Sequence, residues 1–127
     1  AESGQIVWSQ DLSSHSGLAV DAAAVYVATA GGSVSAFRRR DGTEAWQYEG
    51  LRNRDLSGPA AFADSVVVGD LDGYVHFLDA ATGAVQARAR VRGGRVTGSP
   101  LVVNDLVYVQ TEGGRIAALR VRPRARR

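Results

Sequence analysis

Histidine is the side chain best suited to acid–base chemistry near neutral pH, and this chain of 127 residues contains two, His15 and His76. His15 lies in a polar stretch and His76 in an apolar one, so we do not expect them to meet. A histidine metal site needs several ligands, and a serine relay needs a histidine beside a nucleophile and a carboxylate. There is no cysteine to supply a thiolate. We therefore predict no catalytic residue and no metal ligand.

The run Asp70-Leu71-Asp72-Gly73 resembles the opening of a calcium loop, in which carboxylate oxygens bind the ion. It lacks a third ligand pair and a closing glutamate at the required spacing. An Asp-Gly dipeptide between two apolar runs is also typical of a β-hairpin turn. The Gly-rich segment 93–98 matches no phosphate-binding fingerprint and precedes no helix. We interpret the first segment as a turn and the second as a connecting loop.

Basic side chains gather in two places. Arg88, Arg90 and Arg92 alternate with apolar residues and so share one face of a strand. They could meet nucleic-acid phosphates or an acidic protein surface, but no aromatic residue interleaves with them, and we expect no nucleic-acid partner. The preferred interpretation is a solvated outer strand whose charges discourage edge pairing. The Arg-rich end, 120–127, is predicted to be a solvated tail, with contact to anionic lipid or protein as the alternative.

One charged loop is the best candidate for contact with another protein. Arg52, Arg54 and Asp55 lie in a connection that is three residues longer than its counterpart in the first repeat, although the third repeat has the longer spacing too. Charged residues on exposed loops are frequent contributors to binding. We therefore predict that these three residues bind a partner.

Composition places the chain among folded globular proteins. Hydrophobic residues make up 45% and charged residues 22%, and the small net charge of +2 owes its sign to the Arg-rich end. No apolar run is long enough for a membrane span, and the first residues lack the pattern of a signal peptide. We expect any export signal to lie outside this sequence.

The sequence repeats with a period of 41 residues. Each copy has an apolar run that starts after a break, then a strand-like run, then glycines at a fixed phase and a second apolar run. The strand-like runs start at Val25, Val66 and Val107, and the breaks precede Leu18, Pro59 and Pro100. The pairs Gly31-Gly32, Asp72-Gly73 and Gly113-Gly114 predict three hairpins with two-residue type I′ turns.

Four strands per repeat of about 40 residues are typical of a β-propeller blade. Because apolar residues fall on both faces of the third strand and no helical period is present, sheets must stack on sheets. We predict an all-β fold, a propeller fragment of about three four-stranded antiparallel blades. The predicted parts are an outer strand of a preceding blade with its linker (1–17), a blade (18–49), an inter-blade loop (50–58), a blade (59–92), a three-stranded last blade (93–121) and a basic tail (122–127).

The first outer strand, Gly4–Gln10, has no blade of its own, and the last blade lacks an outer strand. Two interpretations remain open. Either the chain is a fragment of a longer ring, or several copies complete a ring through their open blade edges.

The outer-strand pattern that ends in Trp8 and Trp46 resembles the repeat of quinoprotein-like propellers, also called the PQQ-like repeat. The resemblance implies that these tryptophans dock between neighbouring blades; Ala87 departs from the pattern in the last copy. The run Val68–His76 and the order of the blades are similar to the C-terminal blades of the BamB-type outer-membrane barrel-assembly lipoproteins.

That resemblance implies an eight-bladed ring in the periplasm, held at the inner face of the outer membrane by a lipid anchor outside this segment. It further implies a non-catalytic scaffold without a cofactor, which assists barrel assembly by gripping a BamA-like protein. In that family, loops that join an outer strand to the next blade supply the contacts, mainly in earlier blades. The loops of that class here are 13–15, 51–55 and 93–97.

Two other functions are compatible with a propeller. A quinoprotein dehydrogenase would bind pyrroloquinoline quinone and calcium, and the long insertions that carry its ligands are not visible in these compact repeats. A propeller sensor or interaction domain differs from a scaffold only in sequence beyond these termini.

Overall fold

The computed structural model describes residues 4–12, 17–29 and 31–120, and eleven strands lie in these ranges. The first sheet holds β1 (Leu18–Val20), β2 (Ala24–Ala28), β3 (Val34–Arg38) and β4 (Glu44–Tyr48). The second holds β5 (Ala60–Phe62), β6 (Ser65–Gly69), β7 (Tyr74–Asp79) and β8 (Val85–Arg90). The third holds β9 (Val96–Val103), β10 (Leu106–Thr111) and β11 (Ile116–Leu119).

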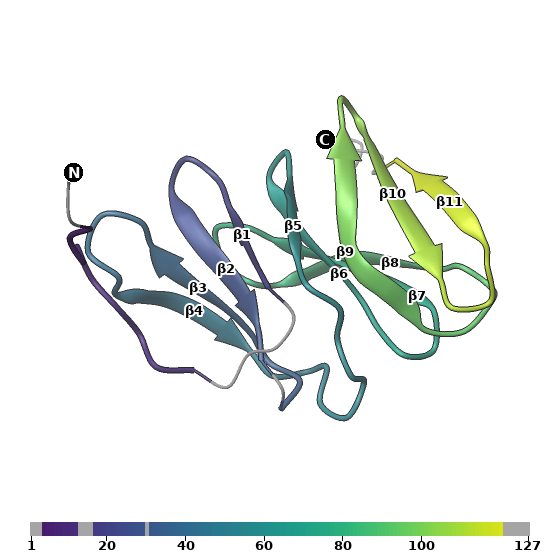
Figure 1. The fold of residues 1–127 in the computed structure, drawn as a ribbon, viewed down its shortest axis with the longest axis horizontal. Helices are drawn as coiled ribbons and strands as arrows, with labels where there is room; N and C mark the ends of the chain where they lie inside the picture. Colours follow the sequence, from purple (N-terminus) through teal and green to yellow (C-terminus); the bar gives the residue numbers. More distant parts are fainter. Residues whose placement is uncertain (1–3, 13–16, 30, 121–127) are drawn as a thin grey trace, which may run out of the picture.

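Every sheet is an antiparallel meander in chain order, with four, four and three strands. The three sheets follow one another across Figure 1, from the first at the N-terminal side to the third at the C-terminal side. They lie within the predicted blade ranges, and the all-β prediction is confirmed. The part of the chain that the structure describes has no helix that could cross a membrane.

The second sheet is buried on both faces because it is the middle layer. Along β6, Val66 and Val68 pack toward the first sheet, in a cluster with Tyr26. Val67 points the other way and packs against the third sheet with Val107. The consecutive valines Val66, Val67 and Val68 therefore form a strand because both of its faces are covered by another sheet.

The hairpin turns differ from the predicted type I′. In the second sheet the N–H of Gly73 donates to the Asp70 carbonyl and the N–H of Asp70 donates to Tyr74, which encloses a three-residue loop. Only the last residue of that loop, Gly73, has a positive φ, at 85°. This is a type I turn followed by a glycine bulge, the usual form of a three-residue hairpin loop. The hairpin at Gly114 repeats the pattern, and the hairpin at Gly32 has the two equivalent hydrogen bonds and a positive φ at Gly32.

The predicted first strand is also corrected. Residues 4–12 belong to no strand and are exposed except for the half-buried Trp8, because the described chain offers them no neighbouring strand with which to form a ladder. Trp8 nevertheless reaches the first sheet and donates from Nε1 to the Arg39 carbonyl at 2.7 Å. The loop at 13–15, with His15, and the tail at 122–127 lie outside the described residues.

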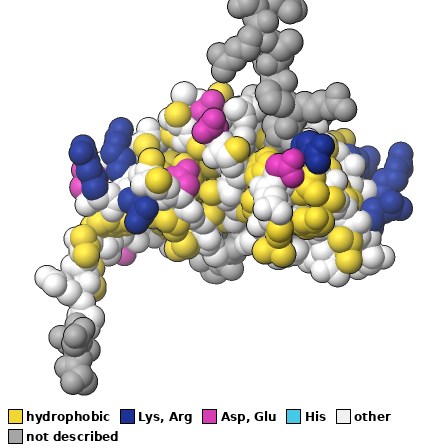
Figure 2. All heavy atoms as spheres, turned by 90° about the horizontal axis from the view of Figure 1, so that it is seen from above, with side chains coloured by type: hydrophobic (Ala, Val, Ile, Leu, Met, Phe, Trp, Pro, Cys, Tyr) yellow, Lys and Arg dark blue, Asp and Glu magenta, His cyan; other side chains and the backbone are white. Residues whose placement is uncertain are grey.

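Large apolar side chains remain exposed at both ends of the stack. Leu18 in β1 is 61% exposed, Leu101 in β9 is 64% exposed and Ile116 in β11 is 70% exposed. Figure 2 likewise shows hydrophobic side chains spread over one face, with most basic side chains toward its two ends. Leu18, Leu101 and Ile116 lie on the outward faces of the first and last sheets, where a further blade would pack in a closed ring.

Candidate functional site

The loop that joins the first two blades is a fixed structure. Its apolar residues Leu51 and Leu56 are buried in the cluster between the two sheets. The Arg54 carbonyl accepts the N–H of Leu71, and the N–H of Ser57 donates to the Gly69 carbonyl, both at 2.8 Å. The loop is thereby tied to the hairpin turn that starts at Asp70, so its charged side chains project from an ordered backbone.

The structure does not bring Arg52, Arg54 and Asp55 together. Arg52 is exposed and pairs with Glu49 at 2.7 Å. Asp55, also exposed, pairs with Arg95 of the next inter-blade loop. Exposed ion pairs of this kind contribute little to stability and can be exchanged for partner contacts. Arg52 and Asp55 are therefore accessible for binding.

Arg54 has a structural role. Its guanidinium is one-third exposed and donates to Asp70 Oδ2 at 3.1 Å, while the Asp70 side chain is completely buried. The same Oδ2 atom lies 2.8 Å from Nε2 of His76, whose side chain is also buried. Asp70 Oδ1 accepts the N–H groups of Asp72 and Tyr74 at 2.9 and 3.0 Å. A buried carboxylate with four donors is fully satisfied.

These contacts set the charges of the cluster. Burial raises the pKa of the Asp70 carboxyl, but hydrogen bonds from His76, Tyr74 and Asp72 outweigh it, so the pKa lies below its ordinary value. Burial lowers the pKa of His76, the Asp70 carboxylate raises it, and the cations Arg54 and Arg88 lower it further. The net shift is downward, and His76 at neutral pH is an uncharged donor to a charged Asp70.

The cluster involves two residues that stood out in the sequence. His76 lies in a strand and donates to a buried carboxylate, and Asp70 precedes the hairpin turn with its acceptor sites facing protein donors. In the described residues no three acidic or histidine side chains come together to hold a metal ion. A signal was present in the repeat: Thr29 and Thr111 occupy the position of Asp70, and each accepts the corresponding N–H at 3.2 Å. The Asp70 carboxylate, in place of a threonine hydroxyl at a buried position, needs hydrogen-bond donors around it.

The tryptophans lie against the next repeat. Trp46 of β4 donates from Nε1 to the Ala80 carbonyl at 2.9 Å, and its ring covers Gly83. Trp8 makes the same contacts one repeat earlier, with Arg39 and Gly42. Trp46 thus links the first and second blades through a ring contact and a hydrogen bond.

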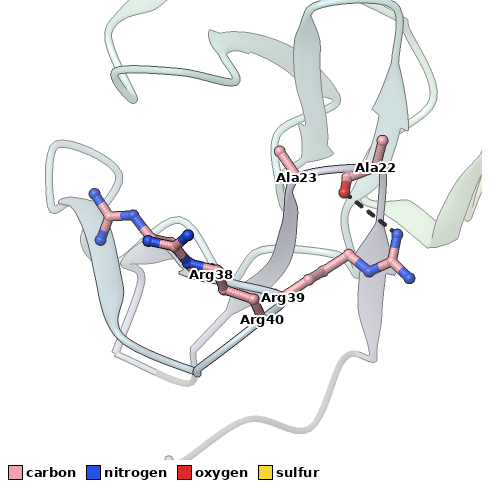
Figure 3. A pocket seen from close by; sticks show the side chains of 5 residues that line it. All are labelled: Ala22, Ala23, Arg38, Arg39 and Arg40. Carbon is pink, nitrogen blue, oxygen red and sulfur yellow. Dashed lines mark hydrogen bonds between the residues drawn. The ribbon is translucent and has the colours of Figure 1, made fainter.

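An open pocket of about 580 Å³ lies in the first blade, where the turn between β1 and β2 meets the end of β3. It is lined by Ala22, Ala23, Arg38, Arg39 and Arg40. Figure 3 shows Arg38 and Arg39 pointing in opposite directions. Arg39 donates to the carbonyls of Asp21 and Ala22, and Arg38 donates to Thr43 and Glu44. Their guanidinium groups bind the protein's own backbone and side chains and do not converge on the pocket.

Stacked antiparallel meanders joined by ordered inter-blade loops, with a tryptophan docked on the next repeat, define a segment of a β-propeller. A family model described as "Outer membrane protein assembly factor BamB" matches residues 1–55 and 31–125. The chain therefore belongs to the BamB family, as the resemblance implied.

Individual relatives agree with this assignment. The outer membrane protein assembly factor BamB of Pseudomonas aeruginosa is 40% identical over 94% of this chain and 32% of its own length. The crystal structure of BamB from Moraxella catarrhalis superimposes with a TM-score of 0.85 and 31% identity, over 93% of this chain and 35% of that one. The fold is shared with enzymes as well, because a quinohemoprotein alcohol dehydrogenase from Pseudomonas putida superimposes with a TM-score of 0.69 and 26% identity, over 87% of this chain and 20% of that one. The chain spans about a third of the length of the curated relatives it matches.

Proposed function

We propose that this chain forms the C-terminal blades of a non-catalytic scaffold that assists the assembly of β-barrel proteins into the outer membrane. The scaffold works in the periplasm, at the inner face of the outer membrane, where a lipid anchor outside this segment holds it. Its partner is a BamA-like barrel-assembly protein. It requires no cofactor for this role.

The observation that carries the proposal is the match of the family model along almost the whole chain. The relatives that match the chain are themselves named outer membrane protein assembly factors. The packing supports a scaffold, because the inter-blade loops are held by backbone hydrogen bonds to the hairpin turns. Rigid loops bind a partner with little loss of conformational entropy.

Within this function, Arg52 and Asp55 make the partner contact and Arg54 holds the loop that presents them. Both contact residues are charged and exposed, and their ion pairs with Glu49 and Arg95 are located at the surface. Charges in such positions act chiefly on the rate and specificity of association.

The test uses the purified full-length protein and the periplasmic domains of the BamA-like protein from the same organism, with binding measured by interferometry. We expect saturable binding, and we expect the charge swap Arg52→Glu with Asp55→Arg to weaken it by about tenfold. The matched control is the swap Arg40→Glu with Asp41→Arg, an exposed pair at the opposite end of β3. Absence of binding would overturn the scaffold proposal, whereas equal effects of the two swaps would overturn only the assignment of the loop.

The alternative is a quinoprotein-dehydrogenase-like propeller, which is favoured by the structural similarity to the Pseudomonas putida enzyme. A dehydrogenase of this kind binds a quinone, whereas the proposed scaffold binds none. Titration of the full-length protein with pyrroloquinoline quinone and calcium therefore distinguishes the two functions. The scaffold proposal expects no change in tryptophan fluorescence. Saturable quenching by the quinone would favour the enzyme.

A further inference from the structure

Three arginine side chains surround the ring of Tyr74 at the outer edge of the second blade. The guanidinium carbons of Arg88, Arg90 and Arg54 lie 4.6, 5.3 and 5.8 Å from the ring centroid. Arg90 is directly opposite Tyr74 in the ladder, and Arg88 is opposite His76, so these side chains share one face of the sheet. The aromatic residue that the sequence of β8 lacks is supplied by the neighbouring strand β7. Cation–π contacts hold the guanidinium groups in place.

Two of these cations have no acidic partner in the described residues. Arg54 is neutralised by Asp70. Arg90 donates from Nε to the backbone carbonyl of Asp72 at 3.3 Å, and neither Arg90 nor Arg88 forms an ion pair within the described ranges. Both are exposed. Two ordered guanidinium groups with free donors form a site for carboxylates or phosphates.

The arrangement is particular to this blade and is not part of the repeat. One period earlier, the positions of Arg88 and Arg90 hold Gln47 and Glu49, and the position of Tyr74 holds Ser33. The first blade forms the same four-stranded sheet with these residues. Blade formation therefore does not require the arginine pair.

The backbone beside this cluster is also open. In the second sheet β8 pairs with β7 on one side and is the outermost strand on the other. The outward N–H and C=O groups of such a strand can pair with an extended segment of another protein. Arginines on an edge repel basic segments, but they attract an acidic one, so they select among incoming strands.

We propose that the edge of β8 binds an extended acidic segment of a partner protein, with carboxylates two residues apart contacting Arg88 and Arg90. Residues i and i+2 of a strand are about 6.6 Å apart and face the same side, which matches the spacing of the two arginines on β8. The site uses other residues than Arg52 and Asp55, although Arg54 between those two contacts the same Tyr74 ring, and it does not depend on the identity of the partner named above.

Other anions fit less well. A single-stranded nucleic acid needs an aromatic face on which its bases can stack, and the Tyr74 ring is already covered by arginines. A membrane surface favours a broad basic patch, whereas acidic Asp72 is exposed one turn away. An edge strand with two fixed cations matches a peptide in both its backbone and its charges.

The test titrates isotope-labelled full-length protein with the peptide Gly-Thr-Glu-Thr-Glu-Thr-Gly and follows the amide signals of β8 by NMR. One control peptide carries glutamine in place of both glutamates. The other, Gly-Thr-Glu-Glu-Thr-Thr-Gly, keeps the charge but places the carboxylates on opposite faces. The protein variant is Arg88→Gln with Arg90→Gln, and the matched control is Arg40→Gln with Arg115→Gln, which removes the same charge elsewhere. Vesicles of phosphatidylcholine and phosphatidylglycerol serve as the lipid probe.

We expect shifts confined to β8 and its neighbours, weakened by about tenfold in the Arg88 and Arg90 variant and within about twofold of the original protein in the control. Both control peptides should bind more weakly than the alternating one. Equal binding of the three peptides, or binding that is insensitive to the Arg88 and Arg90 substitutions, would overturn the proposal. Vesicle binding that depends on the two arginines, without peptide binding, would likewise overturn it and assign the site to a lipid headgroup.

Discussion

The indole ring of Trp46 in the first blade lies directly over Gly83 in the second, so that a Cβ atom added at Gly83 would stand 2.6 Å from its Cδ2 atom. Gly83 also has a positive φ of 81°. The contact therefore requires glycine for two reasons, one steric and one conformational. It links the outer parts of two neighbouring blades directly.

Gly83→Ala is expected to destabilise the protein by about 2–4 kcal/mol, because the left-handed backbone is strained and the indole must move. Gly114→Ala has the positive φ but open space around it, and should cost about 1 kcal/mol. Gly31→Ala has neither feature and should be neutral within about 0.5 kcal/mol. Urea unfolding of the three variants measures the order. Equal costs for Gly83 and Gly114 would show that Trp46 adapts freely.

Asp70→Thr introduces the residue that the other two repeats have at this position. The threonine hydroxyl can still accept the N–H of Tyr74, but Arg54 and His76 lose their acceptor. We expect a loss of about 2–4 kcal/mol, since a buried donor is left unpaired and a partly buried cation loses its partner. Urea unfolding measures it, with Asp64→Thr at an exposed turn as the control.

The double variant Asp70→Thr with His76→Ser matches the first repeat at both positions. Because the two side chains interact directly, its cost should be smaller than the sum of the two single costs. Additive costs would indicate that the hydrogen bond between Asp70 and His76 contributes nothing.

Stability is expected to decrease as the pH falls below about 6.5, because the pKa of His76 is lowered in the folded protein. Between 6.5 and that lower value the unfolded chain binds a proton that the folded protein does not, so acid favours unfolding. Asp70 adds its own loss only below 3.8, as the pH falls through its depressed folded-state pKa. His76→Asn, which keeps a donor but cannot take up a proton, should flatten the decline above pH 3.8. Urea unfolding over this range measures the slope.

The fold was predictable because the signal repeats. The runs starting at Val25, Val66 and Val107 combine apolar residues on both faces with a fixed glycine phase, and these features depend on local geometry. The turn type was wrong, because Asp72-Gly73 is compatible with two-residue and three-residue loops and the choice depends on the register of the ladder. Pairing across strands was not visible either. Tyr74 meets Arg88 and Arg90 only because β7 and β8 align in that register.

The outward faces of the first and third sheets carry exposed apolar side chains. The isolated chain of 127 residues should self-associate, because Leu18, Leu101 and Ile116 expose apolar surface that a blade would cover in a ring. Among the outer edges, β8 carries arginines whereas the sequence Ile116–Leu119 of β11 has no charge, so β11 is the expected site of pairing. Ala118→Lys places a charge on an exposed position of that edge and should shift the mass measured by light scattering toward the monomer, while Ala81→Lys at an exposed turn should not. A monomer at all concentrations would show that the edge is protected, and an oligomer that is insensitive to Ala118→Lys would assign the contact to the apolar faces of β1 and β9.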